Sequence, residues 1–243
     1  MKSTFPIIYE DNHTLVIDKP AGVMVHPDER QDEETIADWF RLTYDVKGVG
    51  DEGRDGVVHR LDRNTTGVLI LAKDNIAYST FKKQFRDHTT RKVYRAIVEG
   101  NIKEDTGMID QALARAKSDF RKRTVVDLFS GDARGEEREA LTRYKVLARA
   151  TTPDGQPYTY VEVYPLTGRT HQIRAHFRGI RHPIIGDDLY GSRSGKDKAP
   201  RSMLHAYSLT IDIPGVEEGK VTKTFTAELP EDMQQVLKKL LLI

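Results

Sequence analysis

The amino-acid sequence predicts an α+β fold with a mixed, largely antiparallel β-sheet core flanked by helices and loops. Segments with the short apolar or alternating patterns of strands outnumber those with helical periodicity. The two kinds of segment do not alternate regularly, as a parallel βαβ arrangement would require. The 243 residues contain no internal repeat and no obvious linker. We therefore expect a single domain over residues 1–243.

The first hundred residues are expected to contain four strands and two helices. The strands are predicted at residues 7–10, 14–18, 67–72 and 91–98, and the helices at 35–42 and from Asp74 onward. The first helix places Ile36, Trp39, Phe40 and Thr43 on one face. The Asp74 side chain is a suitable N-cap for the second helix. Each helix is therefore expected to bury one face against the strands.

The rest of the chain begins with a polar and basic stretch at residues 100–137, where we expect an irregular, exposed hairpin or finger-like insertion. Further strands are predicted at residues 140–150, 158–164, 204–213 and 221–227. A turn that opens a helix is predicted at residues 166–176, and a closing helix at 231–241. Free backbone N–H groups at the first of these helices would suit an anion.

Composition excludes several classes of protein. The chain has no cysteine, so disulfides and thiolate chemistry are ruled out. No apolar run approaches membrane-spanning length, and the N-terminus lacks the apolar core of a signal peptide. We therefore expect a cytoplasmic protein with no membrane partner.

The distribution of charge indicates a nucleic-acid partner, although the net charge is only +1. Lysine and arginine concentrate in three stretches, at residues 82–95, 115–123 and 169–181, which contain few acidic residues. Such clusters often form only a solvated face. Three of them in a nearly neutral chain favour an electropositive groove.

The stretch His59–Gly67 (HRLDRNTTG) is the strongest candidate for catalysis. It leads from a loop rich in glycine and charge into an apolar run that is typical of a buried strand. Asp62 therefore lies at the mouth of a rigid element, where a catalytic carboxylate gains from being held still. The alternative interpretation is an ion-paired turn, with Arg60 and Arg63 as partners of Asp62.

Three other sites are less well supported. The order His-Arg-Leu-Asp differs from the kinase catalytic loop, and no glycine-rich phosphate loop accompanies it. A glycosidase would need a second carboxylate, which no motif indicates. Four histidines could be metal ligands, but there is no cysteine and no pair at i, i+4, so no metal is expected. These are His171, His176, His182 and His205.

Six motifs together resemble the RluA-type pseudouridine synthases. They are Lys19–Pro27, His59–Gly67, Arg91–Ala96, Thr167–His176, Pro183–Gly191 and Leu204–Ala206, in the order of that family. The resemblance runs from about residue 9 to about residue 230. Thr66 stands where serine is the commonest residue, a change that keeps the hydroxyl. No room remains before Tyr9 for the RNA-binding domain that some members carry, so we expect none.

The resemblance implies an isomerase that detaches uracil from its ribose at nitrogen and rejoins it through carbon 5. By match to the motifs, Asp62 is the essential carboxylate, acting on the ribose, on the base, or as a base toward a ribose proton. Tyr94 matches the tyrosine that stacks on the uracil, and Arg174 matches the basic partner of the aspartate. Five further residues are expected to bind substrate: His59, Arg60, Thr65, Arg169 and Leu204.

The same resemblance implies an RNA substrate, a stem-loop of ribosomal or transfer RNA, which a monomer would modify without any cofactor. The active-site cleft is expected to run across the sheet. The alternative is a catalytically silent RNA-binding module or an RNA chaperone that uses the same groove. The combination of Asp62, Tyr94 and Arg174 favours the enzyme, since binding alone needs no such set.

Overall fold

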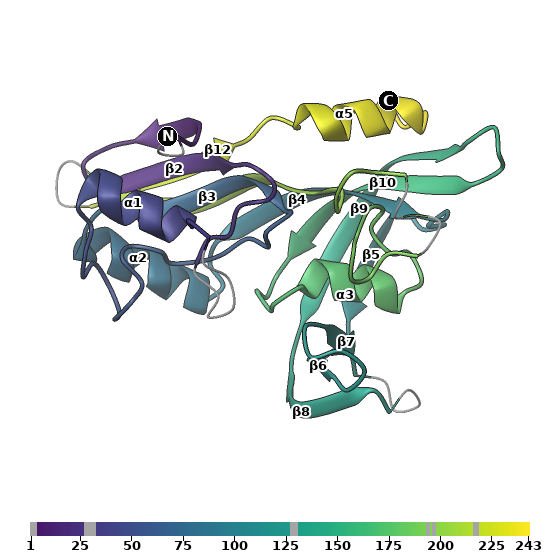
Figure 1. Cartoon of the computed structure of the whole chain (residues 1–243), viewed down its shortest axis with the longest axis horizontal. Helices are drawn as coiled ribbons and strands as arrows, with labels where there is room; N and C mark the ends of the chain where they lie inside the picture. The colour runs from purple at the N-terminus through teal and green to yellow at the C-terminus, as the bar shows by residue number, and fades with distance from the viewer. Residues whose placement is uncertain (1–3, 27–32, 127–130, 193–194, 196–197, 216–218) are drawn as a thin grey trace. The chain divides into compact units, whose positions relative to one another are not determined.

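The computed structural model describes residues 4–26, 33–126, 131–192, 195, 198–215 and 219–243. The chain divides into two compact units: residues 1–92 with 206–228, and residues 93–205 with 229–243. Both units are built on antiparallel strands with helices packed on them, which confirms the predicted α+β fold (Figure 1). The expected single domain over residues 1–243 stays a prediction.

The first unit is a sheet in the order β1-β2-β3-β11, with β12 paired to β11. Its strands are β1 (Ile7–Glu10), β2 (Thr14–Lys19), β3 (Thr66–Ala72), β11 (Leu204–Pro214, from Ala206 in this unit) and β12 (Lys220–Thr226). Every residue of β3 is buried, so this strand is packed on both faces. Because such a strand has little freedom, it is a firm base for the residues that immediately precede it.

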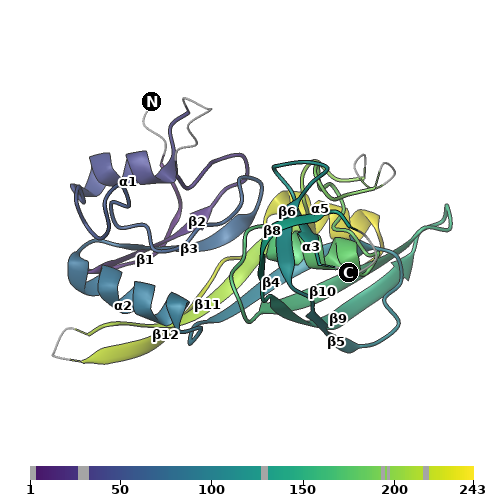
Figure 2. The same ribbon diagram turned by 90° about the horizontal axis from the view of Figure 1, so that it is seen from below.

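Two helices pack on this sheet, α1 (Ile36–Tyr44) and α2 (Asn75–Arg86). The Asp74 side chain accepts a hydrogen bond from the Ala77 N–H, which confirms the predicted N-cap of α2. Helix α2 runs alongside β11 and β12 (Figure 2), and its Phe81 belongs to the same apolar cluster as Phe225 of β12.

One detail of α1 differs from the prediction. Thr43 is exposed, although its spacing placed it on the apolar face. Tyr44 takes that position instead, because its ring centroid lies 5.9 Å from that of Trp39 and 5.3 Å from that of Phe40. An aromatic side chain can reach back across the last turn of a helix, and helical spacing alone does not anticipate this.

The second unit has a four-stranded antiparallel sheet in the order β4-β10-β9-β5. The strands are β4 (Arg91–Glu99, from Val93 in this unit), β10 (Pro157–Pro165), β9 (Leu141–Thr151) and β5 (Thr106–Asp110). Helices α3 (Gln172–Gly179) and α5 (Glu231–Lys239) contribute to the same apolar core. The rings of Tyr144 and Phe177, for example, join β9 to α3 at 5.8 Å.

The basic stretch at residues 100–137 is more regular than predicted. Strand β5 belongs to the main sheet, and three more strands form a small antiparallel sheet in the order β7-β6-β8 (Figure 1). They are β6 (Leu113–Ala116), β7 (Arg123–Val125) and β8 (Ala133–Arg138). Leu113 is buried against Ala175 of α3, so packing rather than local pattern orders these short strands. The irregularity expected of this stretch was therefore wrong, while its being an insertion stays a prediction.

Within the described part of the chain, every helix is too short or too polar to cross a membrane.

Candidate active site

The loop that carries Asp62 lies in the first unit, immediately before β3. The Asp62 carbonyl oxygen accepts a hydrogen bond from the Thr65 N–H at 3.0 Å, which closes a tight turn. Leu61 and Thr65 on either side are 5% and 3% exposed, whereas Asp62 is half-buried. The flanks of the loop are therefore anchored while the carboxylate keeps partial access to solvent.

The buried ammonium group of Lys19 ties this loop to the end of β2. Lys19 is 0% exposed, and its Nζ atom donates hydrogen bonds to the carbonyl oxygens of Pro20, Arg63 and Thr65 at 2.8, 2.9 and 3.0 Å. A buried cation is costly unless such acceptors surround it. The Gly22 N–H also donates to the Arg63 carbonyl oxygen at 3.0 Å. The Lys19–Pro27 motif and the His59–Gly67 motif are thus joined directly by hydrogen bonds.

Gly67, the last residue of the loop motif, fixes how closely β3 approaches β11. Its φ of +110° is rarely adopted by other residues, and a Cβ atom here would lie 2.2 Å from the Ala206 carbonyl oxygen. Both conditions require glycine. The third residue of the Leu204–Ala206 motif is therefore in backbone contact with the loop motif.

His59, which was expected to bind substrate, has contacts within the protein. Its Nε2 atom accepts a hydrogen bond from the Ile70 N–H at 3.1 Å, and its ring stacks on Phe85 with centroids 4.5 Å apart. Burial lowers the pKa of His59 to about 3, and the charge of Lys92 acts in the same direction. The imidazole is therefore neutral at physiological pH and fastens the loop to β3.

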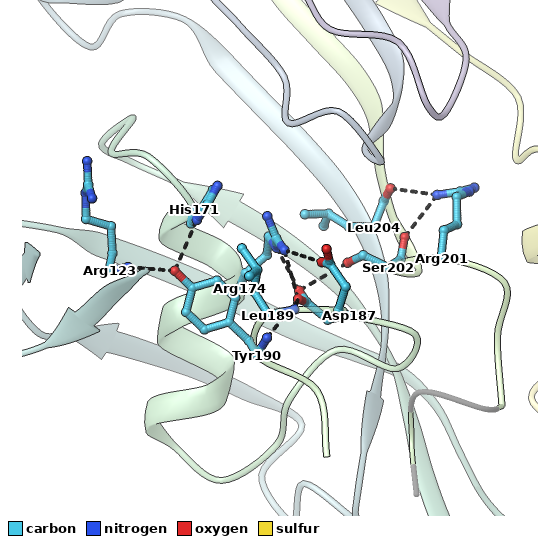
Figure 3. A network of polar contacts seen from close by, with 10 residues as sticks. Arg123, His171, Arg174, Asp187, Leu189, Tyr190, Arg201, Ser202 and Leu204 are labelled. Atoms are coloured by element: carbon cyan, nitrogen blue, oxygen red, sulfur yellow. Dashed lines mark hydrogen bonds and ion pairs between the residues drawn. The ribbon is translucent and has the colours of Figure 1, made fainter. Parts of the chain in front are cut away.

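Arg174 on α3 is the centre of a buried polar network in the second unit (Figure 3). Its Nε and Nη2 atoms lie 2.6 and 2.8 Å from the two carboxylate oxygens of Asp187, and Nη2 lies 3.2 Å from Asp188. The guanidinium carbon is 5.1 Å from the centroid of the Tyr190 ring. A forked ion pair over an aromatic ring fixes the plane of the guanidinium group.

Asp187 has no exposed surface, yet its carboxylate is fully engaged. Besides Arg174, it accepts hydrogen bonds from the N–H groups of Leu189 and Tyr190 at 3.0 and 2.9 Å. Burial by itself raises the pKa of Asp187, but the hydrogen bonds and charge of Arg174 and these N–H groups outweigh it and lower the pKa. Asp187 is a functional candidate that the sequence reasoning missed. Its only signal was its place in the Pro183–Gly191 motif.

The hydroxyl of Tyr190 extends the network toward the small sheet. It accepts a hydrogen bond from the Arg123 N–H at 2.7 Å and lies 3.1 Å from His171 Nδ1. His171 precedes α3 with a φ of +57° and makes no side-chain cap. The side chains of Arg123 and His171 extend to the same side of this hydroxyl (Figure 3).

The family model for RNA pseudouridylate synthase matches residues 13–178. The chain belongs to this family. A protein of Aquifex aeolicus named an uncharacterized RNA pseudouridine synthase is 39% identical over 242 residues, or 95% of this chain and 71% of that protein. Ribosomal large subunit pseudouridine synthase D of Borreliella burgdorferi is 36% identical over 231 residues, or 93% of this chain and 65% of the relative.

The fold agrees with this assignment. The solved structure of human RNA pseudouridylate synthase domain containing 1 superposes with a TM-score of 0.71 at 26% identity, covering 100% of this chain and 97% of that one. RNA pseudouridylate synthases are isomerases that convert uridine in RNA to pseudouridine. The prediction of family and reaction from the sequence is therefore confirmed.

The structure groups the other predicted site residues by unit. Arg60 is exposed on the Asp62 loop, and Thr65 is buried in it. In the second unit, Tyr94 is half-buried on β4 opposite Val163, and its ring packs against the apolar core. Leu204, 4% exposed, belongs to the same core. That Asp62, Tyr94 and Arg174 share one cavity stays a prediction.

Arg169 and the histidines have roles within the fold. The Arg169 Nε atom donates to the Glu139 carbonyl oxygen at 3.1 Å, so it braces the turn before α3. His176 is fully buried between the Thr142 hydroxyl and the Gln111 carbonyl oxygen, at 2.9 Å from each. Among the residues that the structure describes, no group of three histidine, aspartate or glutamate side chains could hold a metal ion.

Proposed function

We propose that this chain isomerises one or more uridines of large-subunit ribosomal RNA to pseudouridine, with Asp62 as the essential carboxylate. The observation that carries the proposal is the way the fold holds the backbone around Asp62. Lys19 and β3 hold the backbone that follows it, and His59, bonded to the Ile70 N–H, holds the backbone before it, while Asp62 itself is only half-buried. A surface turn held together by ion pairs would need no such buried anchor.

The choice of RNA follows the names of related proteins. Proteins of Borreliella burgdorferi, Zymomonas mobilis and Pseudomonas aeruginosa that are 34–36% identical to this chain are each named ribosomal large subunit pseudouridine synthase D. We therefore place large-subunit ribosomal RNA ahead of transfer RNA, the other substrate class that the sequence allowed.

In the proposed reaction the bond between N1 of uracil and C1′ of ribose breaks, and its electron pair leaves with the base. The base turns, C5 forms the new bond to C1′, the proton on C5 is lost, and N1 gains a proton. Asp62 attacks C1′, attacks the base, or removes a ribose proton. All three roles require an ionised carboxylate, and burial alone would oppose ionisation.

Arg174 and Tyr94 complete the proposed chemistry. We assign Arg174 as the cationic partner of the Asp62 carboxylate. The ion pair with Asp187 already fixes the orientation of the guanidinium group, so binding in that orientation costs little further conformational entropy. Because the reacting atoms of a stacked base are inaccessible, the nucleotide must swing out, at a cost of a few kcal/mol. Stacking on the Tyr94 ring would return roughly 1–3 kcal/mol.

The remaining predicted residues divide into two groups in this proposal. Arg60, which is exposed, contacts RNA near the everted nucleotide, and Leu204 lines the pocket for the base. His59, Thr65 and Arg169 position the loops from within, as their contacts to the protein support. The proposed enzyme is a cytoplasmic monomer. It needs no metal or cofactor, since the rearrangement changes neither the redox state nor the atom count of the substrate.

The test is release of tritium from large-subunit ribosomal RNA transcribed with uridine labelled at carbon 5. We expect release by the unaltered chain in the presence of a chelator, and none by Asp62→Asn. Asp105→Asn, which removes an exposed carboxylate of the second unit, is the matched control and keeps activity. Equal release by Asp62→Asn would refute the role of Asp62. RNA binding by the unaltered chain without any release would instead support the silent RNA-binding module.

A further inference from the structure

Three arginines stand side by side across the small sheet β7-β6-β8. Arg115 on the central strand is directly opposite Arg123 of β7 on one side and Arg134 of β8 on the other. Residues directly opposite in antiparallel strands point to the same face, with Cβ atoms roughly 5 Å apart. The register therefore places three guanidinium groups in one row, called here the arginine row.

Within the part of the chain that the structure describes, ion pairs do not balance the charge of the arginine row. Among the described residues, no carboxylate forms an ion pair with Arg115, Arg123 or Arg134, whereas the neighbouring Arg121 and Arg138 pair with Asp119 and Glu136. Burial lowers the pKa of Arg123, and the charges of Arg115 and Arg138 lower it further. Like charges directly opposite destabilise a sheet. A structural role does not account for such a row.

The arginine row is connected to the Arg174 network. On the same face of the small sheet, two residues along from Arg115, Leu113 packs against Ala175 and Tyr190. The backbone N–H of Arg123 donates to the Tyr190 hydroxyl, and the Tyr190 ring contacts the Arg174 guanidinium (Figure 3). A ligand on the row would therefore lie beside the residues assigned to catalysis in this unit.

An exposed aromatic ring accompanies the row. Phe120 lies in the turn between β6 and β7 and is 54% exposed. Aromatic side chains beside cationic ones are the usual platform for single-stranded nucleic acid, because phosphates pair with the cations and bases stack on the ring.

We propose that Arg115, Arg123 and Arg134 bind successive phosphates of single-stranded RNA flanking the target nucleotide, with a base stacked on Phe120. This inference rests on the proposed function in taking RNA as the ligand. It assigns to the basic segment at residues 100–137 the role of holding the strand beside the active site.

The experiment measures binding of a fluorescein-labelled dodecamer of oligouridylate by anisotropy, from about 0.05 to about 0.3 M salt. For Arg115→Gln/Arg134→Gln we expect weaker binding and a salt slope smaller by about 1.4, because each phosphate contact on a single strand contributes about 0.7. Phe120→Ala should weaken binding by about tenfold and leave the slope unchanged, since stacking releases no counterions.

The matched control is Arg143→Gln/Lys145→Gln, which also removes two exposed charges. Tyr144 between them packs on Phe177 of α3, so both side chains lie on the opposite face of the main sheet. We expect this control to keep the slope of the unaltered chain. The melting temperature of Arg115→Gln should not fall, because its removal relieves repulsion.

An unchanged slope in Arg115→Gln/Arg134→Gln, or an equal loss of slope in the control, would overturn the inference. The same holds if the unaltered chain shows no salt-dependent binding. The assay needs no turnover. Binding with the expected slopes but without tritium release would therefore refute the proposed function. It would still support RNA binding by the arginine row.

Discussion

The Nζ atom of Lys19 lies 3.0 Å from the carbonyl oxygen of Thr65, three residues after Asp62. This contact joins the end of β2 to the loop that carries the proposed catalytic carboxylate. The lysine is 0% exposed and directs its charge onto backbone oxygens of that loop and of Pro20. Its removal would leave the Thr65 and Pro20 oxygens without this donor, while the Arg63 oxygen keeps the Gly22 N–H.

Lys19→Met, which keeps the aliphatic stem, is therefore expected to destabilise the protein. Loss of the donor should lower the free energy of unfolding by about 2 kcal/mol or more, because a buried acceptor left unsatisfied costs about 1–3 kcal/mol. Urea denaturation followed by circular dichroism measures this free energy of unfolding. The exposed Lys47→Met is the control, with a change of about 0.5 kcal/mol or less. Equal stability of both variants would show that the buried ammonium does not hold the loop.

Gly67→Ala should strongly destabilise the first unit. The new Cβ atom would meet the Ala206 carbonyl oxygen at 2.2 Å, and the φ of +110° adds strain. We expect a loss of more than about 3 kcal/mol from strain and overpacking combined. Gly155→Ala in the second unit has a φ of +79° but nothing within 4 Å, so it isolates the backbone cost at about 1 kcal/mol. Similar thermal shifts for the two would contradict the close approach of β3 and β11.

Asp187 makes stability depend on pH in the acidic range. Its pKa is lowered in the folded state, so its contribution is complete above the unfolded value near 4 and is lost as pH falls through the folded value. Asp187→Ala should cost about 3–5 kcal/mol at pH 7, because it leaves Arg174 buried without its carboxylate partner. The difference from the unaltered chain should narrow below about pH 4.

Denaturation curves at a series of pH values give this difference directly. Asp105→Ala removes an exposed carboxylate and should be nearly neutral throughout. A gap between Asp187→Ala and the unaltered chain that widens on acidification would show that the pKa of Asp187 is raised, not lowered.

How much of this could be predicted from the sequence depended on how local the signal was. Strand β3 and helix α2 follow from apolar periodicity and the Asp74 cap, and both were predicted. Strand β6 has only four residues and is ordered by packing on α3, which no local pattern reveals. Short strands that depend on partners distant in the sequence cannot be predicted from hydrophobic periodicity.

The candidate site shows the same division. Asp62 and Arg174 were identified because complete motifs surround them. The burial of Lys19 was missed because lysine is almost always exposed, and only its position before the Pro-Ala-Gly turn hinted otherwise. The arginine row was missed because a register between three strands cannot be read from their order in the sequence. The basic composition of residues 100–137 is equally typical of a solvated protein surface.

His59 should remain neutral across the physiological range. Burial lowers its pKa to about 3, so nuclear magnetic resonance of the imidazole nitrogens should show no titration between about pH 5 and 8. Because the unfolded chain takes up a proton near pH 6.5 and the folded chain does not, stability falls as pH drops from that value toward 3. His59→Gln should remove this part of the pH dependence while keeping an acceptor near the Ile70 N–H. Titration of His59 near pH 6.5 would mean that the loop before Asp62 is open to solvent, contrary to its hydrogen bond with β3.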